Sequence, residues 1–80
     1  MEKESNEVLK IFGETLRTIR KERNLSQTDL AYICCLDRTY ISGLERGRRN
    51  PTLKVIAEIA DKLEINASEL VSKIGVATNE

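Results

Sequence analysis

Four side chains able to contact the edges of base pairs stand close together in the middle of this 80-residue chain: Arg38, Thr39, Tyr40 and Ser42. They share the outward face of a short amphipathic segment, together with Gly43, whereas Ile41 and Leu44 point inward. An arginine can bond the guanine edge twice, a threonine can meet a thymine methyl group, and a tyrosine can make apolar or phosphate contacts. This set is typical of a helix that contacts bases in the major groove of DNA.

A second group of polar side chains lies in a segment with the composition of a loop. It comprises Arg46, Arg48, Arg49 and Asn50, with Gly47 as a helix stop and Pro51 as a breaker. Helices predicted to begin near Gln27 and after Thr52 would offer free N–H groups and positive dipole ends to phosphate. We therefore expect Gln27 and the loop residues to contact the DNA backbone, although the arginines could also belong to a merely soluble loop. For Glu45 we expect a structural role, as a helix cap or in an ion pair with an arginine.

Positive charge is concentrated in the middle of a chain whose net charge is zero. Between Arg17 and Lys54 nine Lys and Arg residues stand against four acids, and outside this window four Lys residues stand against nine acids. The two parts therefore carry net charges of +5 and −5. This division favours one basic face apposed to a polyanion, although a charged run is often only a solvated surface.

The spacing of apolar residues predicts five helices. They cover residues 5–23, 27–34, 38–45, 53–63 and 67–74. The expected N-caps are Ser26, Asp37, Thr52 and Asn66, and the expected C-terminal stops are Asn24 and Gly75. Gly13 falls inside the first helix, where glycine costs about 1 kcal/mol relative to alanine, and close packing is the only reason that the sequence suggests.

Short connections and the lack of alternating strand patterns indicate an all-α, compact domain of five helices spanning residues 1–80, with its core over about residues 5–75. The short second and third helices are joined by a tight turn, and small or apolar residues such as Leu30, Ala31 and Leu36 would hold them together. This is the pattern of a helix-turn-helix motif, here over about residues 27–46.

The motif residues resemble a known family. Ser26-Gln27-Thr28-Asp29-Leu30-Ala31, Ile41-Ser42-Gly43-Leu44-Glu45-Arg46-Gly47 and Asn50-Pro51 are similar to the Cro/C1-type (Xre-like) helix-turn-helix family, with its lambda-repressor-like fold. Within it, residues 37–46 with Arg49-Asn50 look most similar to the controller proteins of restriction–modification systems. The resemblance implies a small dimeric transcriptional regulator that binds an operator. One departure is Cys35. It stands where the family usually has a glycine in a left-handed turn, and a residue other than glycine costs about 1 kcal/mol in that conformation.

Part of the apolar surface of the last two helices exceeds what one small core can absorb, and we expect it to form a subunit interface. The candidate residues are Val55, Ile65, Leu70, Val71 and Ile74. A homodimer would place two recognition helices about 34 Å apart, and its operator would then be an inverted repeat in double-stranded DNA.

Several other classes of function are disfavoured. The chain has no His, and the adjacent Cys34 and Cys35 can neither complete a metal site nor staple separate elements. We expect no enzyme activity, cofactor, small-molecule ligand or membrane segment, and a cytoplasmic location. RNA polymerase is a further candidate partner. The alternatives are a phage-type repressor, an antitoxin autoregulator, or a helical protein-interaction module that uses the same fold.

Overall fold

The computed structural model describes residues 2–78 of the chain, and the side chains of residues 7–75. Over residues 2–78 it contains no strand, and its helices are α1 (Glu2–Glu22), α2 (Gln27–Cys34), α3 (Arg38–Glu45), α4 (Leu53–Leu63) and α5 (Ala67–Thr78). The all-α prediction is confirmed, and the bounds of α2, α3 and α4 agree with the predicted ones residue for residue. The terminal helices are both longer than predicted.

Gly75 does not end α5, and this prediction is wrong. The helix continues through it to Thr78. A glycine ends a helix when it adopts a left-handed conformation, but Gly75 has ordinary helical backbone geometry and open space around it. It therefore only weakens the helix locally. At the other end, α1 begins at Glu2 instead of Ser5.

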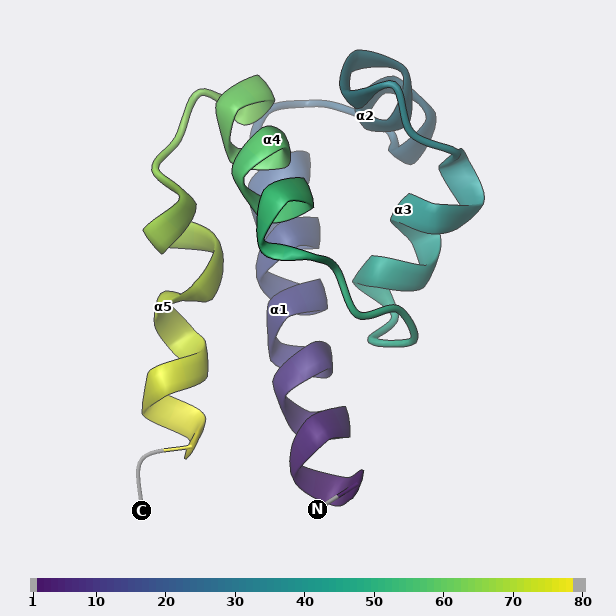
Figure 1. The fold of residues 1–80 in the computed structure, drawn as a ribbon. Coiled ribbons are helices and arrows are strands. Elements are labelled where there is room, and N and C mark those ends of the chain that lie inside the picture. Colours follow the sequence, from purple (N-terminus) through teal and green to yellow (C-terminus); the bar gives the residue numbers. More distant parts are fainter. Residues whose placement is uncertain (1, 79–80) are drawn as a thin grey trace.

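The helices surround one apolar core. In Figure 1, α1 and α5 run side by side in opposite directions, and the short α2 and α3 occupy the other side of α1. Helix α4 is drawn in front of the upper part of α1 and contacts α5 and α2. All five helices contribute to the fully buried set, which contains Phe12, Leu16, Leu30, Ile41, Leu44, Ile59, Leu63 and Leu70. None of the described helices is long and apolar enough to cross a membrane.

Three of the helices end in a left-handed residue that is not glycine. Asn24, Cys35 and Glu64 have φ angles of 60°, 58° and 60°. After Cys35, the Leu36 amide donates to the Ala31 carbonyl at 2.8 Å, and Leu36 packs against the core. A bond of this kind satisfies a carbonyl that the end of a helix leaves unpaired and reverses the chain within two residues. Cys35 therefore adopts the left-handed turn conformation that the family usually gives to a glycine, a point that the sequence left open.

Gly13 lets α1 and α3 approach each other closely. A Cβ atom at position 13 would lie 2.5 Å from the Glu45 carbonyl oxygen, and closer still to that of Leu44. Both of these atoms belong to the backbone of the last turn of α3, so they cannot move aside as a flexible side chain could. The backbone of α1 therefore supports the C-terminal end of α3, which explains a glycine that the helical pattern alone does not.

Candidate nucleic-acid interface

The N-terminus of α3 is defined by Asp37. Its carboxylate accepts hydrogen bonds from the Thr39 amide and the Thr39 hydroxyl, both at 2.9 Å. These bonds, with weaker contributions from Arg38 and Arg49, hold the pKa of Asp37 below its usual value. Because the hydroxyl of Thr39 donates its hydrogen to the cap, its methyl group and the lone pairs of its oxygen are the parts left to make a new contact.

All four residues predicted to contact bases reach the surface of α3. Arg38 and Thr39 are exposed, and Tyr40 and Ser42 are half-buried. Gly43, which the helical pattern also places outward, is buried, so that expectation is wrong. The reason is tertiary, because the side chain of Arg49 covers it.

Arg49 lies back along α3 instead of extending from its loop. A Cβ atom at Gly43 would lie 2.6 Å from the Cγ atom of Arg49, and the guanidinium carbon of Arg49 stands 5.2 Å from the centre of the Tyr40 ring. This is a cation–π arrangement. It adds a second positive charge to the face that carries Arg38, and it contacts the tyrosine ring.

A buried ion pair joins the end of α3 to α1. The Nε and Nη2 atoms of Arg20 donate to the two carboxylate oxygens of Glu45, at 2.6 and 3.0 Å, and both side chains are more than nine-tenths buried. Nη1 of Arg20 donates to the Leu25 carbonyl at 2.7 Å. Hydrogen bonding to Glu45 raises the pKa of Arg20. The expected ion pair of Glu45 with an arginine is confirmed, and its partner is Arg20.

Gln27 connects this ion pair to α3. Its Nε2 atom donates to Oε1 of Glu45 at 3.0 Å, and its Oε1 atom accepts from Nη1 of Arg38 at 3.2 Å. The side chain that was expected to contact phosphate is therefore already bonded within the protein. Neither bond was foreseen from the sequence.

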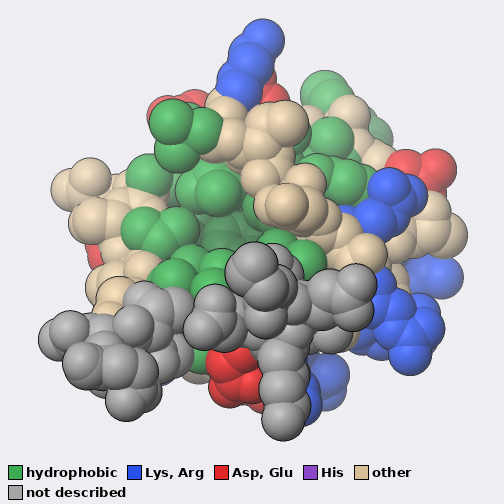
Figure 2. All heavy atoms as spheres, turned by 60° about the horizontal axis from the view of Figure 1, so that its bottom comes forward, with side chains coloured by type: hydrophobic (Ala, Val, Ile, Leu, Met, Phe, Trp, Pro, Cys, Tyr) green, Lys and Arg blue, Asp and Glu red, His purple; other side chains and the backbone are tan. Residues whose placement is uncertain are grey.

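The basic loop after α3 is docked against α1. The Gly47 and Arg48 amides donate to the Leu44 and Gly43 carbonyls at 3.1 and 2.8 Å, and Gly47 has a φ angle of 73° with Lys10 against it. The exposed residues Arg46, Arg48 and Asn50 project from this turn. Lys and Arg side chains gather on the side of Figure 2 that corresponds to the α3 side of Figure 1.

The helix N-termini near this surface differ in charge. At α2, Ser26 and Asp29 form a reciprocal capping box, so a carboxylate already occupies the first turn and its bonds to Ser26 lower the pKa of Asp29. At α4, Thr52 caps the helix through a 3.1 Å bond from the Val55 amide, and the first turn holds no acid. The N-terminus of α4 is therefore the better place for a phosphate group.

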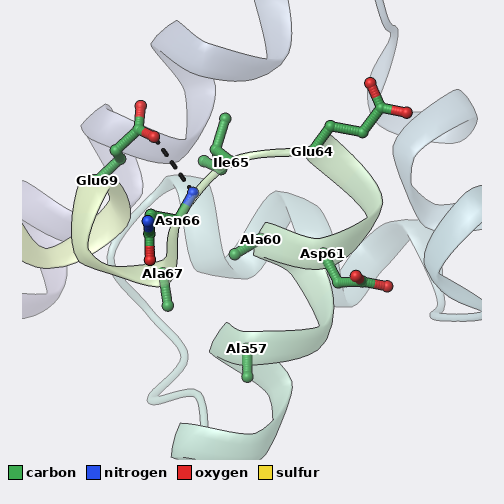
Figure 3. Close-up of a pocket in the computed structure, with 8 residues that line it drawn as sticks. All are labelled: Ala57, Ala60, Asp61, Glu64, Ile65, Asn66, Ala67 and Glu69. Atoms are coloured by element: carbon green, nitrogen blue, oxygen red, sulfur yellow. Dashed lines mark hydrogen bonds between the residues drawn. The ribbon is translucent and has the colours of Figure 1, made fainter.

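The corner between α4 and α5 carries acidic side chains, in contrast to the basic α3 side. Figure 3 shows a groove floored by alanines, with carboxylates at its rim; it is lined by Ala57, Ala60, Asp61, Glu64, Ile65, Asn66, Ala67 and Glu69. Glu69 accepts a 3.2 Å bond from the Asn66 amide, which closes one half of the predicted capping box of α5. A surface with this charge disfavours the binding of a phosphate group.

The residues predicted to form a subunit interface divide into two groups. Val55, Ile65, Val71 and Ile74 are half-buried and retain some surface. Leu70 is fully buried in the core of the same chain, so it cannot line an interface, and its assignment was wrong.

Comparison with known proteins identifies the class. The family model described as "Helix-turn-helix" matches residues 16–70, and the chain belongs to this family. This confirms the resemblance drawn from the motif residues. The control protein C.BamHI of Bacillus amyloliquefaciens is 41% identical over 68 residues, which cover 84% of each chain.

Solved structures agree with this placement. The restriction-modification controller protein C.AhdI from Aeromonas hydrophila superposes with a TM-score of 0.76 at 45% identity, covering 78% of this chain and 94% of the other. The controller protein C.Esp1396I was solved as a tetramer in complex with its natural 35 base-pair operator. It superposes with a TM-score of 0.74 at 39% identity, covering 84% of this chain and 88% of the other.

Proposed function

We propose that this protein is a sequence-specific DNA-binding transcriptional regulator, and that it is the controller protein of a restriction–modification system. The observation that carries the proposal is the match to controller proteins along most of both chains, combined with an exposed α3 whose polar face has the residue types that contact base edges. We expect such a regulator to act in the cytoplasm, without an enzymatic step.

The roles of individual residues follow from their positions. Arg38, Thr39, Tyr40 and Ser42 contact bases in the major groove, because they lie on the surface of α3. The exposed loop residues Arg46, Arg48 and Asn50 contact phosphates, next to the uncompensated N-terminus of α4. Arg49 contributes to both kinds of contact, since its guanidinium rests on Tyr40.

The protein acts as a homodimer on an inverted repeat. One eight-residue helix contacts only a few base pairs, whereas two related by a two-fold axis double the contacts. We assign the interface to the half-buried residues Val55, Ile65, Val71 and Ile74 of α4, α5 and their connection. Figure 2 shows hydrophobic side chains gathered in a hollow in the middle of one face of the subunit, as a self-associating surface requires.

Selection of random duplex DNA on the purified protein tests the proposal. We expect enrichment of an inverted repeat whose half-site centres are about 10–11 base pairs apart, one turn of B-DNA. The absence of any enriched sequence would refute operator binding and favour a protein partner instead. Flanking genes then separate the kinds of regulator: a methyltransferase and an endonuclease mark a controller, phage genes a repressor, and a toxin gene an antitoxin.

A further inference from the structure

Two thiols line one groove between the C-terminal end of α2 and the side of α4. The groove contains Cys34 and Cys35, and beside them Leu36 and, from α4, Lys54, Ala57 and Lys62. Cys35 is exposed, Cys34 is half-buried, and neither thiol is used in the proposed contacts with bases or phosphates. We propose that this groove is a binding site for trivalent arsenic compounds that carry one organic group, and that both thiols bond the arsenic atom.

The two sulfurs are poorly placed for a disulfide with each other but can share one larger atom. The Cα atoms of Cys34 and Cys35 are about 3.8 Å apart across the trans peptide that joins them, whereas bridged cysteines keep theirs about 4.4 to 6.8 Å apart. An arsenic atom between the sulfurs adds one atom to the ring. The sulfurs then need not approach to the length of an S–S bond, so the pair remains available as a dithiol.

The number of protein ligands selects the chemical class. Thiolates favour soft partners, and a structural or catalytic zinc ion takes three or four protein ligands. Within residues 2–78 no group of three or more His, Cys, Asp or Glu side chains could hold a metal ion. A trivalent arsenic atom that already has one bond to carbon needs only two sulfurs to complete its valence. The adjacent thiols satisfy this requirement without a third residue.

The binding reaction balances without an oxidant or a reductant. With phenylarsine oxide, both S–H bonds and the bonds between arsenic and oxygen break, and two arsenic–sulfur bonds form. The oxygen leaves as water with the two thiol hydrogens. Arsenic remains trivalent, and both sulfurs keep the oxidation state of a thiol.

The groove supplies contacts that the thiols alone do not. Burial raises the pKa of the Cys34 thiol, Lys62 lowers it and Cys35 raises it, so both neighbours act on the Cys34 sulfur. Leu36, Ala57 and the carbon chain of Lys62 offer apolar surface to an aryl group on the arsenic atom. An unfolded chain has the same two thiols but none of this surface. The folded protein should therefore bind an aryl arsenical more tightly than the unfolded chain does.

The test titrates the reduced protein with phenylarsine oxide and follows mass and thermal unfolding. Mass spectrometry should show one phenylarsenic group per chain, added with the loss of one water molecule. Cys34→Ser and Cys35→Ser should each weaken binding about 100-fold or more, because the second bond is no longer intramolecular. The melting temperature of the wild type should rise by about 5–10 °C, which corresponds to roughly tenfold tighter binding by the folded state.

A pair of matched variants separates the groove from the thiols. Ala57→Gln places a longer side chain in the groove, and Ser68→Gln places the same side chain at an exposed position outside it. Ala57→Gln should keep the adduct but reduce the rise in melting temperature, and Ser68→Gln should keep both.

Two kinds of result would overturn the site. Equally tight binding by either single-cysteine variant would show that arsenic does not bond both sulfurs. A melting temperature that stays constant or falls with the arsenical, or an equal rise in Ala57→Gln and Ser68→Gln, would show that the groove contributes nothing. None of these results bears on operator binding, which the selection of duplex DNA tests separately.

Discussion

Replacing Gly13 by alanine tests the packing of α1 against α3, because local and tertiary effects have opposite signs. In the middle of an exposed helix, glycine to alanine stabilises by about 0.8 to 1 kcal/mol. At position 13, however, the added methyl carbon would lie 2.5 Å from the Glu45 carbonyl oxygen, so the last turn of α3 must move away. Forcing an extra carbon into a packed interface typically costs about 1 to 3 kcal/mol. We expect the second effect to dominate and the protein to be destabilised.

Gly75 provides the matched control. It also lies within a helix, but a Cβ atom there meets nothing within 4 Å. Gly75→Ala should therefore raise the free energy of unfolding by about 0.5 to 1 kcal/mol. In a domain of this size each kcal/mol shifts the melting temperature by about 4–8 °C, so thermal unfolding followed by circular dichroism separates the two signs. A Gly13→Ala protein as stable as the wild type, or more stable, would refute the close-contact explanation.

Three further predictions concern the turns and the interface. Cys35→Gly and Glu64→Gly should each raise the free energy of unfolding by about 1 kcal/mol, because a left-handed backbone suits glycine. The control variant Cys35→Ala should give no such gain. A lower melting temperature for the glycine variants would contradict the left-handed geometry. The pKa of Asp37 is lowered in the folded state, so its charge stabilises the protein above about pH 4 and this contribution is lost as pH falls through the folded pKa. Asp37→Asn keeps a good helix cap, so the difference in unfolding free energy between it and the wild type should shrink on acidification; a pH-independent difference would show that the charge is irrelevant. Arg38→Ala should cost about 1 to 3 kcal/mol of binding free energy at one base pair per half-site. Arg48→Ala should instead weaken binding to all duplexes and reduce the dependence of the logarithm of the binding constant on that of the salt concentration by about one per subunit. If the two variants behaved alike on specific and random duplexes, the assigned roles would be refuted.

The central helices were predictable because their boundaries depend on local bonds. Ser26, Asp37 and Thr52 each accept a hydrogen bond from an amide two or three residues ahead. Each cap therefore depends on a few consecutive residues and can be predicted from them. The end of α5 was not predictable in this way. Gly75 could stop a helix or be carried within it, and no nearby residue decides between the two outcomes.

The site was predictable only in outline. Helical periodicity places Arg38, Thr39 and Tyr40 on the surface of α3, and the structure agrees. The bonds that organise them join residues far apart in the chain: Gln27 lies 18 positions before Glu45, and Arg20 lies 25 before it. No period or spacing marks such pairs, so these hydrogen bonds could not be predicted from the sequence.

The burial of Gly43 shows the same limit. A helical wheel counts only the residues of the helix itself, and it leaves this position open. Arg49 returns from the following loop and fills that space. Only the path of the loop, which is set by the left-handed Gly47 against Lys10, determines that this arginine and Tyr40 meet.

Helix α3 is held against α1 through its C-terminal half, and this has a consequence for how such regulators diversify. Leu44 and Glu45 are buried, and the backbone beside them rests on Gly13, whereas Arg38 and Thr39 project into solvent from the other end. The residues that fix the position of the helix are therefore not the ones that we propose to contact base pairs. New operator preferences can arise by exchange of a few exposed side chains on an unchanged scaffold, so that related regulators can coexist in one cell without acting on each other's promoters.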